Sequence, residues 1–322
     1  MAEQNEILNK SFNRRKKIYL IIAILIGVLL IAPKDITWAR DRINYLVYAE
    51  SSWTIMQRYI SNGILSFFSN EPLFLGINII LSFVFLPENS LKIIIFTSTL
   101  GTLYSLGKIS KYNFWVLFFF LFLPQIVQNN VTHLRQGLAL SLYLLGLTSN
   151  KKYGEIIKYA SVFVHISFGF IIIFEFLEAF FKKIKFSSEL RIFLSSIFLT
   201  AFVFVVPNLA LFFGDRRVME YDFTVTKDAS GLGFLLWLIV GMFFIFVIKK
   251  NYISSISCYG IMLYLVAYFF LDFGARIFEN IIPLILVSAL NDDRKEIRIT
   301  YILFFLFYGA IQWYSTGVNF LI

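Results

Sequence analysis

A succession of apolar runs, separated by short stretches rich in Lys and Arg, restricts the fold of this chain more than any other feature. The runs begin near Ile18, Leu73, Leu91, Phe114, Leu134, Ile156, Leu190, Leu232, Ile253, Ile277 and Ile299. A helix that crosses a bilayer needs roughly 17–25 predominantly apolar residues. Hydrophobic residues make up 58% of the chain, and no loop is large enough to form a soluble domain. The pattern predicts an all-α, polytopic integral membrane protein.

We expect a single transmembrane domain over residues 1–322, with about 10–11 membrane helices that include re-entrant or broken segments. The net charge of +9 does not indicate nucleic acid binding, because the basic residues lie between apolar runs, as in cytoplasmic loops. The cluster from Arg14 to Lys17 places the N-terminus in the cytoplasm. No small-residue cleavage site precedes Pro33, so the first run is expected to be a retained helix rather than a signal peptide.

Two runs have lengths that do not suit one simple span. The run 73–86 has about 14 residues, which fits a re-entrant segment better than a crossing. The stretch 155–181 has about 27 residues and would be roughly 40 Å long as one helix. We expect a helical hairpin or a broken pair there, with its turn near His165–Gly169. Residues 34–72 and 214–231 are expected to be outer-face loops, the first with an interfacial helix over 53–68.

In this topology several ionisable groups converge on the outer face. They are Asp41, Glu71, His133, Arg135, Arg216, Arg217 and Arg276. A charge inside the bilayer is costly, so such groups indicate a functional site. Guanidinium groups bind phosphate with planar, paired donors. The arginines are therefore candidates for binding an anionic ligand such as a diphosphate.

Each arginine also has a structural interpretation. Arg135 lies at the start of the helix from Leu134, which Thr132 is expected to cap. Instead of binding an anionic ligand, the side chain of Arg135 can reach the lipid headgroups. The Arg216–Arg217 pair follows Asp215 and can form a surface ion pair with it. Arg276 lies between Asp272 and Glu279, at spacings that allow pairing along one helix.

Three residues are candidate proton acceptors for a hydroxyl group: Glu71, Asp41 and His165. The alternatives are solvated loop carboxylates and, for His165, a structural histidine with satisfied hydrogen bonds. The chain has two His and one Cys, Cys258, so no transition-metal site and no disulfide framework are expected. Nucleotide-binding glycine loops and hydrolase motifs are absent, and no cofactor is expected.

Four short motifs carry a family resemblance. They are Asp41-x-x-x-Tyr45, Glu71-Pro72-Leu73-Phe74, Leu134-Arg135-Gln136-Gly137-Leu138-Ala139 and His165-Ile166-Ser167, in that order. Together they resemble the EpsG / O-antigen polymerase (Wzy) type of bacterial polysaccharide polymerase over roughly residues 35–175. Beyond this region the resemblance is in hydropathy only. The Asp41 motif lacks the Gly-rich segment expected before it.

The resemblance implies a multi-pass glycosyltransferase of the bacterial cytoplasmic (inner) membrane that acts at the outer face in the synthesis of polysaccharide such as lipopolysaccharide. It would join undecaprenyl-diphosphate-linked oligosaccharide units without a metal. Glu71, His165 and Asp41 would be catalytic, and His133 and Gln136 would bind sugar. The arginines that the charge pattern already singles out, Arg135, Arg216, Arg217 and Arg276, would then bind the diphosphate. Membrane lipid and a chain-length regulator protein are the further partners that it implies.

Two other functions fit the same residues. A flippase or exporter of lipid-linked oligosaccharide also needs buried cations, but it needs no hydroxyl base, and many transporters contain internal repeats. The sequence has no detectable internal repeat. A ligase that transfers finished glycan to another acceptor is separated from a polymerase only by the motif resemblance.

Overall fold

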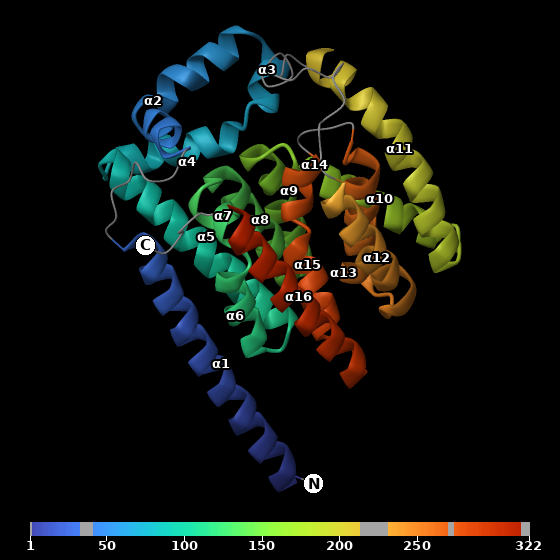
Figure 1. The fold of residues 1–322 in the computed structure, drawn as a ribbon. Helices are drawn as coiled ribbons and strands as arrows, with labels where there is room; N and C mark the ends of the chain where they lie inside the picture. The colour runs from blue at the N-terminus through green and yellow to red at the C-terminus, as the bar shows by residue number, and fades with distance from the viewer. Residues whose placement is uncertain (1, 33–40, 213–230, 270–273, 317–322) are drawn as a thin grey trace.

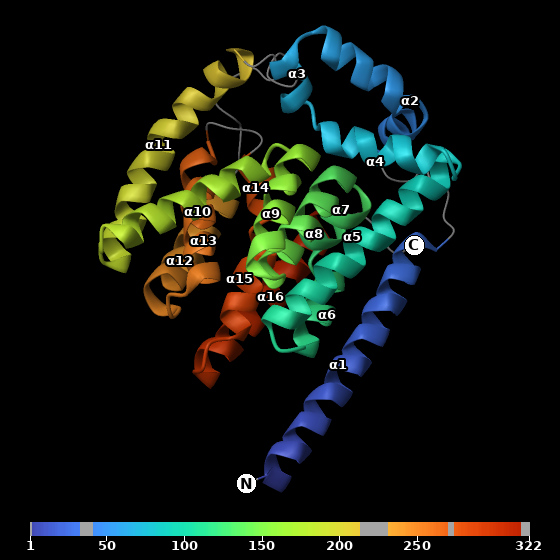
Figure 2. The same ribbon diagram turned by 180° about the vertical axis from the view of Figure 1, so that it is seen from behind.

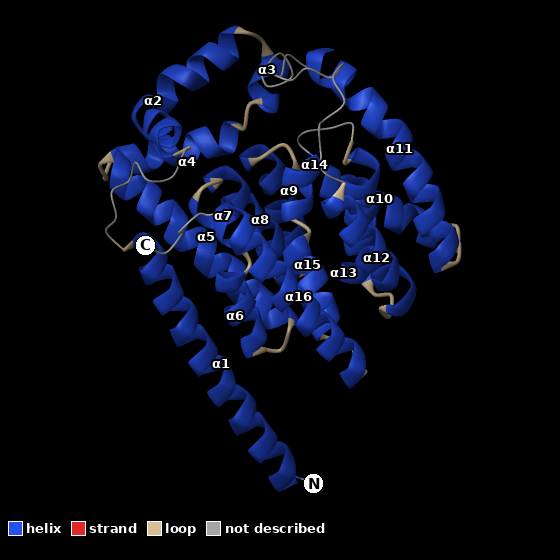
Figure 3. Cartoon of the chain, in the orientation of Figure 1, coloured by secondary structure: helices blue, strands red, loops and turns tan. Residues whose placement is uncertain are grey.

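The computed structural model describes residues 2–32, 41–212, 231–269 and 274–316, and every regular element in these ranges is a helix (Figure 3). The first half of the chain forms α1 (Ala2–Ile31), α2 (Arg42–Ser61), α3 (Ile64–Ser69), α4 (Pro72–Ser82), α5 (Pro87–Ile109), α6 (Phe114–Phe122), α7 (Pro124–Val131) and α8 (Leu134–Thr148). The second half forms α9 (Lys151–Val164), α10 (Phe168–Lys183), α11 (Ser188–Phe212), α12 (Leu232–Val247), α13 (Tyr252–Ala267), α14 (Gly274–Glu279), α15 (Ile282–Leu290) and α16 (Lys295–Thr316). The all-α prediction is confirmed.

The helices α5, α8 and α9 pack together in the body of the molecule, from which the N-terminal part of α1 projects (Figures 1 and 2). Glycines allow these helices to approach closely. A Cβ atom on Gly101 of α5 would lie 2.0 Å from Ser141 Oγ of α8, and one on Gly146 of α8 would lie 2.7 Å from the Gly154 carbonyl oxygen of α9. Small residues at helix contacts are typical of membrane helix bundles.

One described helix, α16, is long and apolar enough to cross a bilayer by itself, over Lys295–Ser315. The pair α6 and α7 passes the same criterion jointly, but the two helices meet at an angle of 77°. Helices α4, α12 and α13 are apolar but shorter than a span. Length and composition therefore support one or two crossings in the described residues, and the larger number expected from the sequence stays a prediction.

The described surface carries many large apolar side chains. Phe83 is 82% exposed, Phe246 72% and Leu303 60%, whereas Asn129 and Asn280 are completely buried. Soluble proteins rarely expose large contiguous apolar patches. Apolar helices with outward-facing Phe, Leu and Ile side chains indicate association with a membrane.

The helix break predicted near His165 is confirmed, because α9 ends at Val164 and α10 begins at Phe168. The Nζ atom of Lys158 in α9 lies 2.7 Å from Oε2 of Glu175 in α10. In one straight helix these residues would be about 26 Å apart along the axis. The two helices therefore fold back on each other as a hairpin.

Two other apolar runs, for which no break was predicted, are also divided. The run from Phe114 is broken between α6 and α7, because a proline at Pro124 cannot continue the hydrogen bonding of the preceding turn. The run from Arg276 to Leu290 is broken at Asn280 and Ile281, between α14 and α15.

The two predicted outer loops have different outcomes. Most of 41–69 is helical, as α2 and α3, so helix extends beyond the interfacial segment expected over 53–68. Of 214–231, only Gly231 lies within the described residues. The short run from Leu73 forms α4, which has 11 residues. This length agrees with a segment that does not cross the bilayer, and the absence of a crossing stays a prediction.

Candidate functional site

A group of charged and titratable side chains, here called the polar cluster, lies where α2, α4, α8 and α14 meet the turn between α9 and α10. The turns before α2, α4 and α8 and the residues near the helix breaks supply its members. They are Asp41, Glu71, His133, Arg135, His165 and Glu279. The helices α4 and α14 occupy the upper part of the body in Figure 1.

Glu71 is the most buried member of the polar cluster, with 4% of its side chain exposed. It precedes Pro72, the first residue of α4, and has a left-handed backbone with φ 60° and ψ 52°. This conformation costs a residue with a side chain roughly 1–2 kcal/mol. Backbone strain of this kind concentrates at functional sites.

The carboxylate of Glu71 contacts two cationic or titratable groups. Its Oε2 lies 2.5 Å from Nη1 of Arg135, and its Oε1 lies 3.3 Å from Nδ1 of His165. Arg135 follows Glu71 by 64 residues along the chain. The interaction therefore depends on the packing of α4 against the α8 and α9–α10 region.

The guanidinium of Arg135 also lies over two aromatic rings of α2. Its central carbon is 5.7 Å from the ring centre of Tyr45 and 5.3 Å from that of Tyr48. Aromatic faces attract cations more strongly where water is excluded. Glu71 and the two tyrosines together hold the guanidinium in a fixed orientation.

His133, which precedes Arg135 in the chain, lies between the carboxylates of Asp41 and Glu279. Its Nε2 is 4.0 Å from Oδ2 of Asp41, and its Nδ1 is 3.7 Å from Oε2 of Glu279. The positive charge of Arg276 interacts electrostatically with both His133 and Glu279. The geometry thus brings Arg276, an exposed residue of α14, into the neighbourhood of the cluster.

Asn280, at the break between α14 and α15, links the elements that surround the cluster. Its amide nitrogen donates to Oγ of Ser167 at 3.5 Å and to the carbonyl oxygen of Arg276 at 3.3 Å. Its side-chain oxygen accepts a hydrogen bond of 3.2 Å from Asn129 of α7. The breaks after α9 and α14 therefore lie near each other and near the last turn of α7.

Buried polar atoms without a hydrogen-bond partner among the described residues are concentrated in this region. They include Nε of Arg135, Nδ1 of His133, Oε1 of Gln136, Oγ1 of Thr132 and Oε2 of Glu279. Most buried polar atoms in folded proteins are hydrogen-bonded, so each exception requires an explanation. A polar ligand bound among these groups would supply the missing partners.

The N-terminus of α8 differs from the prediction. His133, not Thr132, is the residue before the helix, and it forms no side-chain cap hydrogen bond. The expected cap is absent because the helix begins at Leu134, so His133 rather than Thr132 occupies the capping position. Gly137 permits the tight turn from α7 into α8, since a Cβ there would lie 2.1 Å from the Asn129 carbonyl oxygen.

The structure thus brings together Asp41, Glu71, His133, Arg135 and His165, with Arg276 nearby, and buries Gln136 beside them. Their functional roles stay predictions. The predicted pair Arg216 and Arg217 lies outside the described residues.

Glu279 was predicted only as a pairing partner of Arg276, and Asn280 was not predicted as a site residue. The signal available was a pair of polar residues inside an apolar run. In the described ranges no group of three or more His, Cys, Asp or Glu side chains has a geometry suited to a metal ion.

Comparison with known proteins identifies one family. The profile of the EpsG family matches residues 7–320, nearly the whole chain. No curated protein and no solved structure matches the sequence. The chain belongs to the EpsG family, which is linked to exopolysaccharide synthesis.

Proposed function

We propose that this member of the EpsG family is a polysaccharide polymerase, a glycosyltransferase that joins lipid-diphosphate-linked oligosaccharide units at the outer face of the bacterial cytoplasmic membrane. The observation that carries the proposal is the contact between Arg135, Glu71 and His165. It combines an oriented cation for a leaving diphosphate with a carboxylate–histidine pair able to accept a proton.

The diphosphate is bound by guanidinium groups. Nη1 of Arg135 faces Glu71, and its buried Nε, which has no hydrogen-bond partner among the described residues, can donate to a phosphate oxygen. Arg276 supplies a second positive charge, and Arg216 and Arg217 are proposed to supply more. The first turn of α8 adds backbone N–H groups at a helix N-terminus, which attract anions.

The proton acceptor is His165, oriented by Glu71. Nδ1 lies beside both the Glu71 carboxylate and the backbone N–H of Ser167, so Nε2 is the ring nitrogen that takes the proton of the acceptor hydroxyl. The hydroxyl oxygen then attacks the anomeric carbon of the donor sugar, and the bond from that carbon to the diphosphate oxygen breaks. The lipid diphosphate leaves with the bonding electrons, and the arginines stabilise its developing charge without a metal.

The sugars adjoining the reacting bond are bound by the second half of the polar cluster. His133 and Gln136 present buried polar atoms without hydrogen-bond partners among the described residues, as does Glu279. Asp41 and Glu279 flank His133 and can orient it toward a sugar hydroxyl. Glu71 is the alternative proton acceptor if His165 serves only to position it, and Asp41 is the alternative if neither of them accepts the proton.

The proposal includes a multi-pass arrangement with a cytoplasmic N-terminus and the polar cluster toward the outer face. The basic residues near Arg14 and the outward-facing apolar side chains support it. The substrate is then undecaprenyl-diphosphate-linked oligosaccharide, with its prenyl chain among membrane lipids. A chain-length regulator protein is proposed as a further partner.

One reconstitution tests the function. Purified protein in detergent is mixed with a short lipid-diphosphate oligosaccharide, with and without a chelator, and products are separated by size. A polymerase produces a ladder of longer lipid-linked products in both conditions. A flippase gives no ladder and moves the substrate across proteoliposome membranes, whereas a ligase transfers glycan only to a different acceptor. Folded protein that forms no ladder contradicts the proposal.

A further inference from the structure

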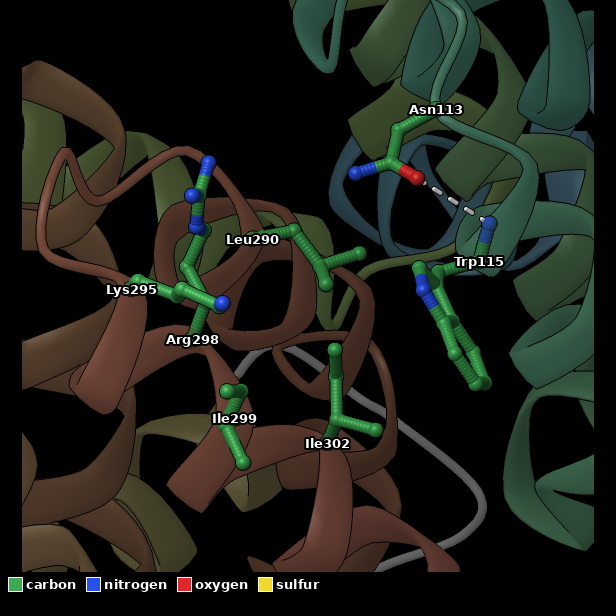
Figure 4. A pocket seen from close by; sticks show the side chains of 7 residues that line it. All are labelled: Asn113, Trp115, Leu290, Lys295, Arg298, Ile299 and Ile302. Atoms are coloured by element: carbon green, nitrogen blue, oxygen red, sulfur yellow. Dashed lines mark hydrogen bonds between the residues drawn. The ribbon is translucent and has the colours of Figure 1, made fainter.

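A second candidate site lies at the end of the helix bundle near α6 and the start of α16. A hollow of about 240 Å³ is lined by Asn113, Trp115, Leu290, Lys295, Arg298, Ile299 and Ile302. Figure 4 shows Lys295 and Arg298 on the α16 side and Asn113 and Trp115 on the α6 side, with Leu290 and Ile302 between them. We call this hollow the basal pocket.

The basal pocket contains two cations without a carboxylate partner. Lys295 and Arg298 are three residues apart on α16, and neither forms an ion pair within the described ranges. Glu296, which is exposed and lies between them in the chain, forms no ion pair with either cation in the described ranges, and the other nearby acidic residues contact other groups. Asp292 binds Arg294 through both carboxylate oxygens, at 2.8 and 2.7 Å, and Asp293 lies 3.8 Å from Lys249. The positive charge of the pocket is therefore not neutralised by the neighbouring acids.

The pocket also lies where a lipid headgroup would be. Lys295 is the first residue of α16, the described helix that is long and apolar enough to cross a bilayer. Ile299 and Leu303, exposed on the same helix, continue the apolar surface away from the two cations. Trp115 borders the pocket at the same level, and Trp is enriched at the boundary between headgroups and hydrocarbon.

Further basic residues gather at this end of the bundle. Arg15 of α1 donates a hydrogen bond of 3.0 Å to the carbonyl oxygen of Tyr112, the residue before Asn113. Lys16 lies 5.9 Å from the Tyr112 ring centre. Lys and Arg accumulate on the cytoplasmic side of membrane proteins, where anionic lipids attract them. The pocket therefore adjoins the leaflet in which anionic headgroups are available.

We propose that the basal pocket binds the headgroup of an anionic phospholipid. The phosphate lies between Lys295 and Arg298, Asn113 and Trp115 contact the glycerol part, and one acyl chain follows Ile299 and Leu303. Pockets for drug-sized ligands measure roughly 300–1,000 Å³, so the smaller hollow suits a headgroup rather than a whole soluble ligand. This inference is independent of the proposed glycosyltransferase activity.

The test compares phosphatidylglycerol with phosphatidylcholine of the same acyl chains, bound to delipidated full-length protein and counted by native mass spectrometry. The double variant K295A/R298A removes the two pocket cations. The control K151A/K152A removes two exposed lysines at the start of α9. At about 1 kcal/mol for each basic residue near an anionic surface, K295A/R298A should bind phosphatidylglycerol roughly 30-fold more weakly. The control should bind it like the wild-type protein.

Three results would overturn the proposal. Equal retention of the two lipids by the wild-type protein would mean that no anionic site exists. Equal weakening by both double variants would indicate a general effect of net charge. Full displacement of phosphatidylglycerol by millimolar inorganic phosphate would identify the pocket as a site for a soluble anion. Size-exclusion chromatography of each variant establishes that it is folded.

Discussion

Removing either partner of the ion pair between Arg135 and Glu71 should destabilise the protein strongly, and removing both should cost less than the sum. The side chain of Glu71 is 4% exposed and that of Arg135 is 21% exposed. Each variant, R135Q or E71Q, leaves the other charge buried without its ion-pair partner. Breaking a buried pair in this way costs about 3–5 kcal/mol. Because Arg135 is partly exposed, we expect the lower end of that range.

The interaction energy between the charges of Arg135 and Glu71 follows from Coulomb's law. Two unit charges 4 Å apart interact by about 4 kcal/mol at an effective dielectric constant of 20. The double variant E71Q/R135Q removes both charges, so its unfolding free energy should exceed the additive expectation by about 2–3 kcal/mol. Unfolding of the purified protein in mixed micelles, followed by tryptophan fluorescence, measures these differences.

An exposed pair in the same protein provides the control. Lys249 and Asp293 are 81% and 88% exposed and lie 3.8 Å apart. Exposed pairs contribute about 0–1 kcal/mol, so K249Q should change the unfolding free energy little. If R135Q and E71Q are no more destabilising than K249Q, or if their effects are additive, the buried pair does not exist as described.

Three further predictions concern other parts of the chain. G137A should lower stability because its Cβ would meet the Asn129 carbonyl, whereas G76A, with open space around it, should be neutral or stabilising in thermal unfolding. Hydrogen bonds from Arg294 lower the pKa of Asp292 to about 2, so its contribution is complete above pH 4 and is lost as the pH falls toward 2. D292N should therefore reduce the unfolding midpoint at pH 7 but approach wild type near pH 2. A cysteine at Lys111 should resist an impermeant reagent added outside intact cells, and ready labelling there would contradict the charge-derived topology.

Structural features that depend on short segments of the chain could be predicted from the sequence. The length of 155–181 and the Ser–Gly pair after His165 predicted the break between α9 and α10. The apolar runs predicted the all-helical fold. The break at Pro124 has a clear sequence signal, the proline itself, but was not predicted. The break at Asn280 has only a weak signal, because two polar residues in an apolar run do not by themselves end a helix.

Contacts between distant segments could not be predicted in the same way. From the sequence, Glu71 was predicted to be catalytic and Arg135 to bind the diphosphate, whereas the fold places the two side chains in direct contact. Their approach depends on how α4 packs against the start of α8. Nor did the sequence indicate that Glu279 faces His133, since the spacing to Arg276 suggested pairing along one helix. These are properties of tertiary packing.

The central claim is that Arg135 binds the diphosphate and that the Glu71–His165 pair accepts the proton. The most direct measurement is the elongation rate and the donor affinity of single variants in the purified system. R135A should weaken both, and R135K should recover only part of each, because an ammonium keeps the charge but not the planar donors.

H165A should keep donor affinity nearly unchanged and slow elongation by roughly 10²–10⁴-fold, the usual contribution of a positioned proton acceptor. E71Q should follow H165A in rate, and D41N serves as the test of the alternative acceptor. If H165A, E71Q and D41N all elongate glycan at near wild-type rates while folded, the assignment of the proton acceptor is contradicted.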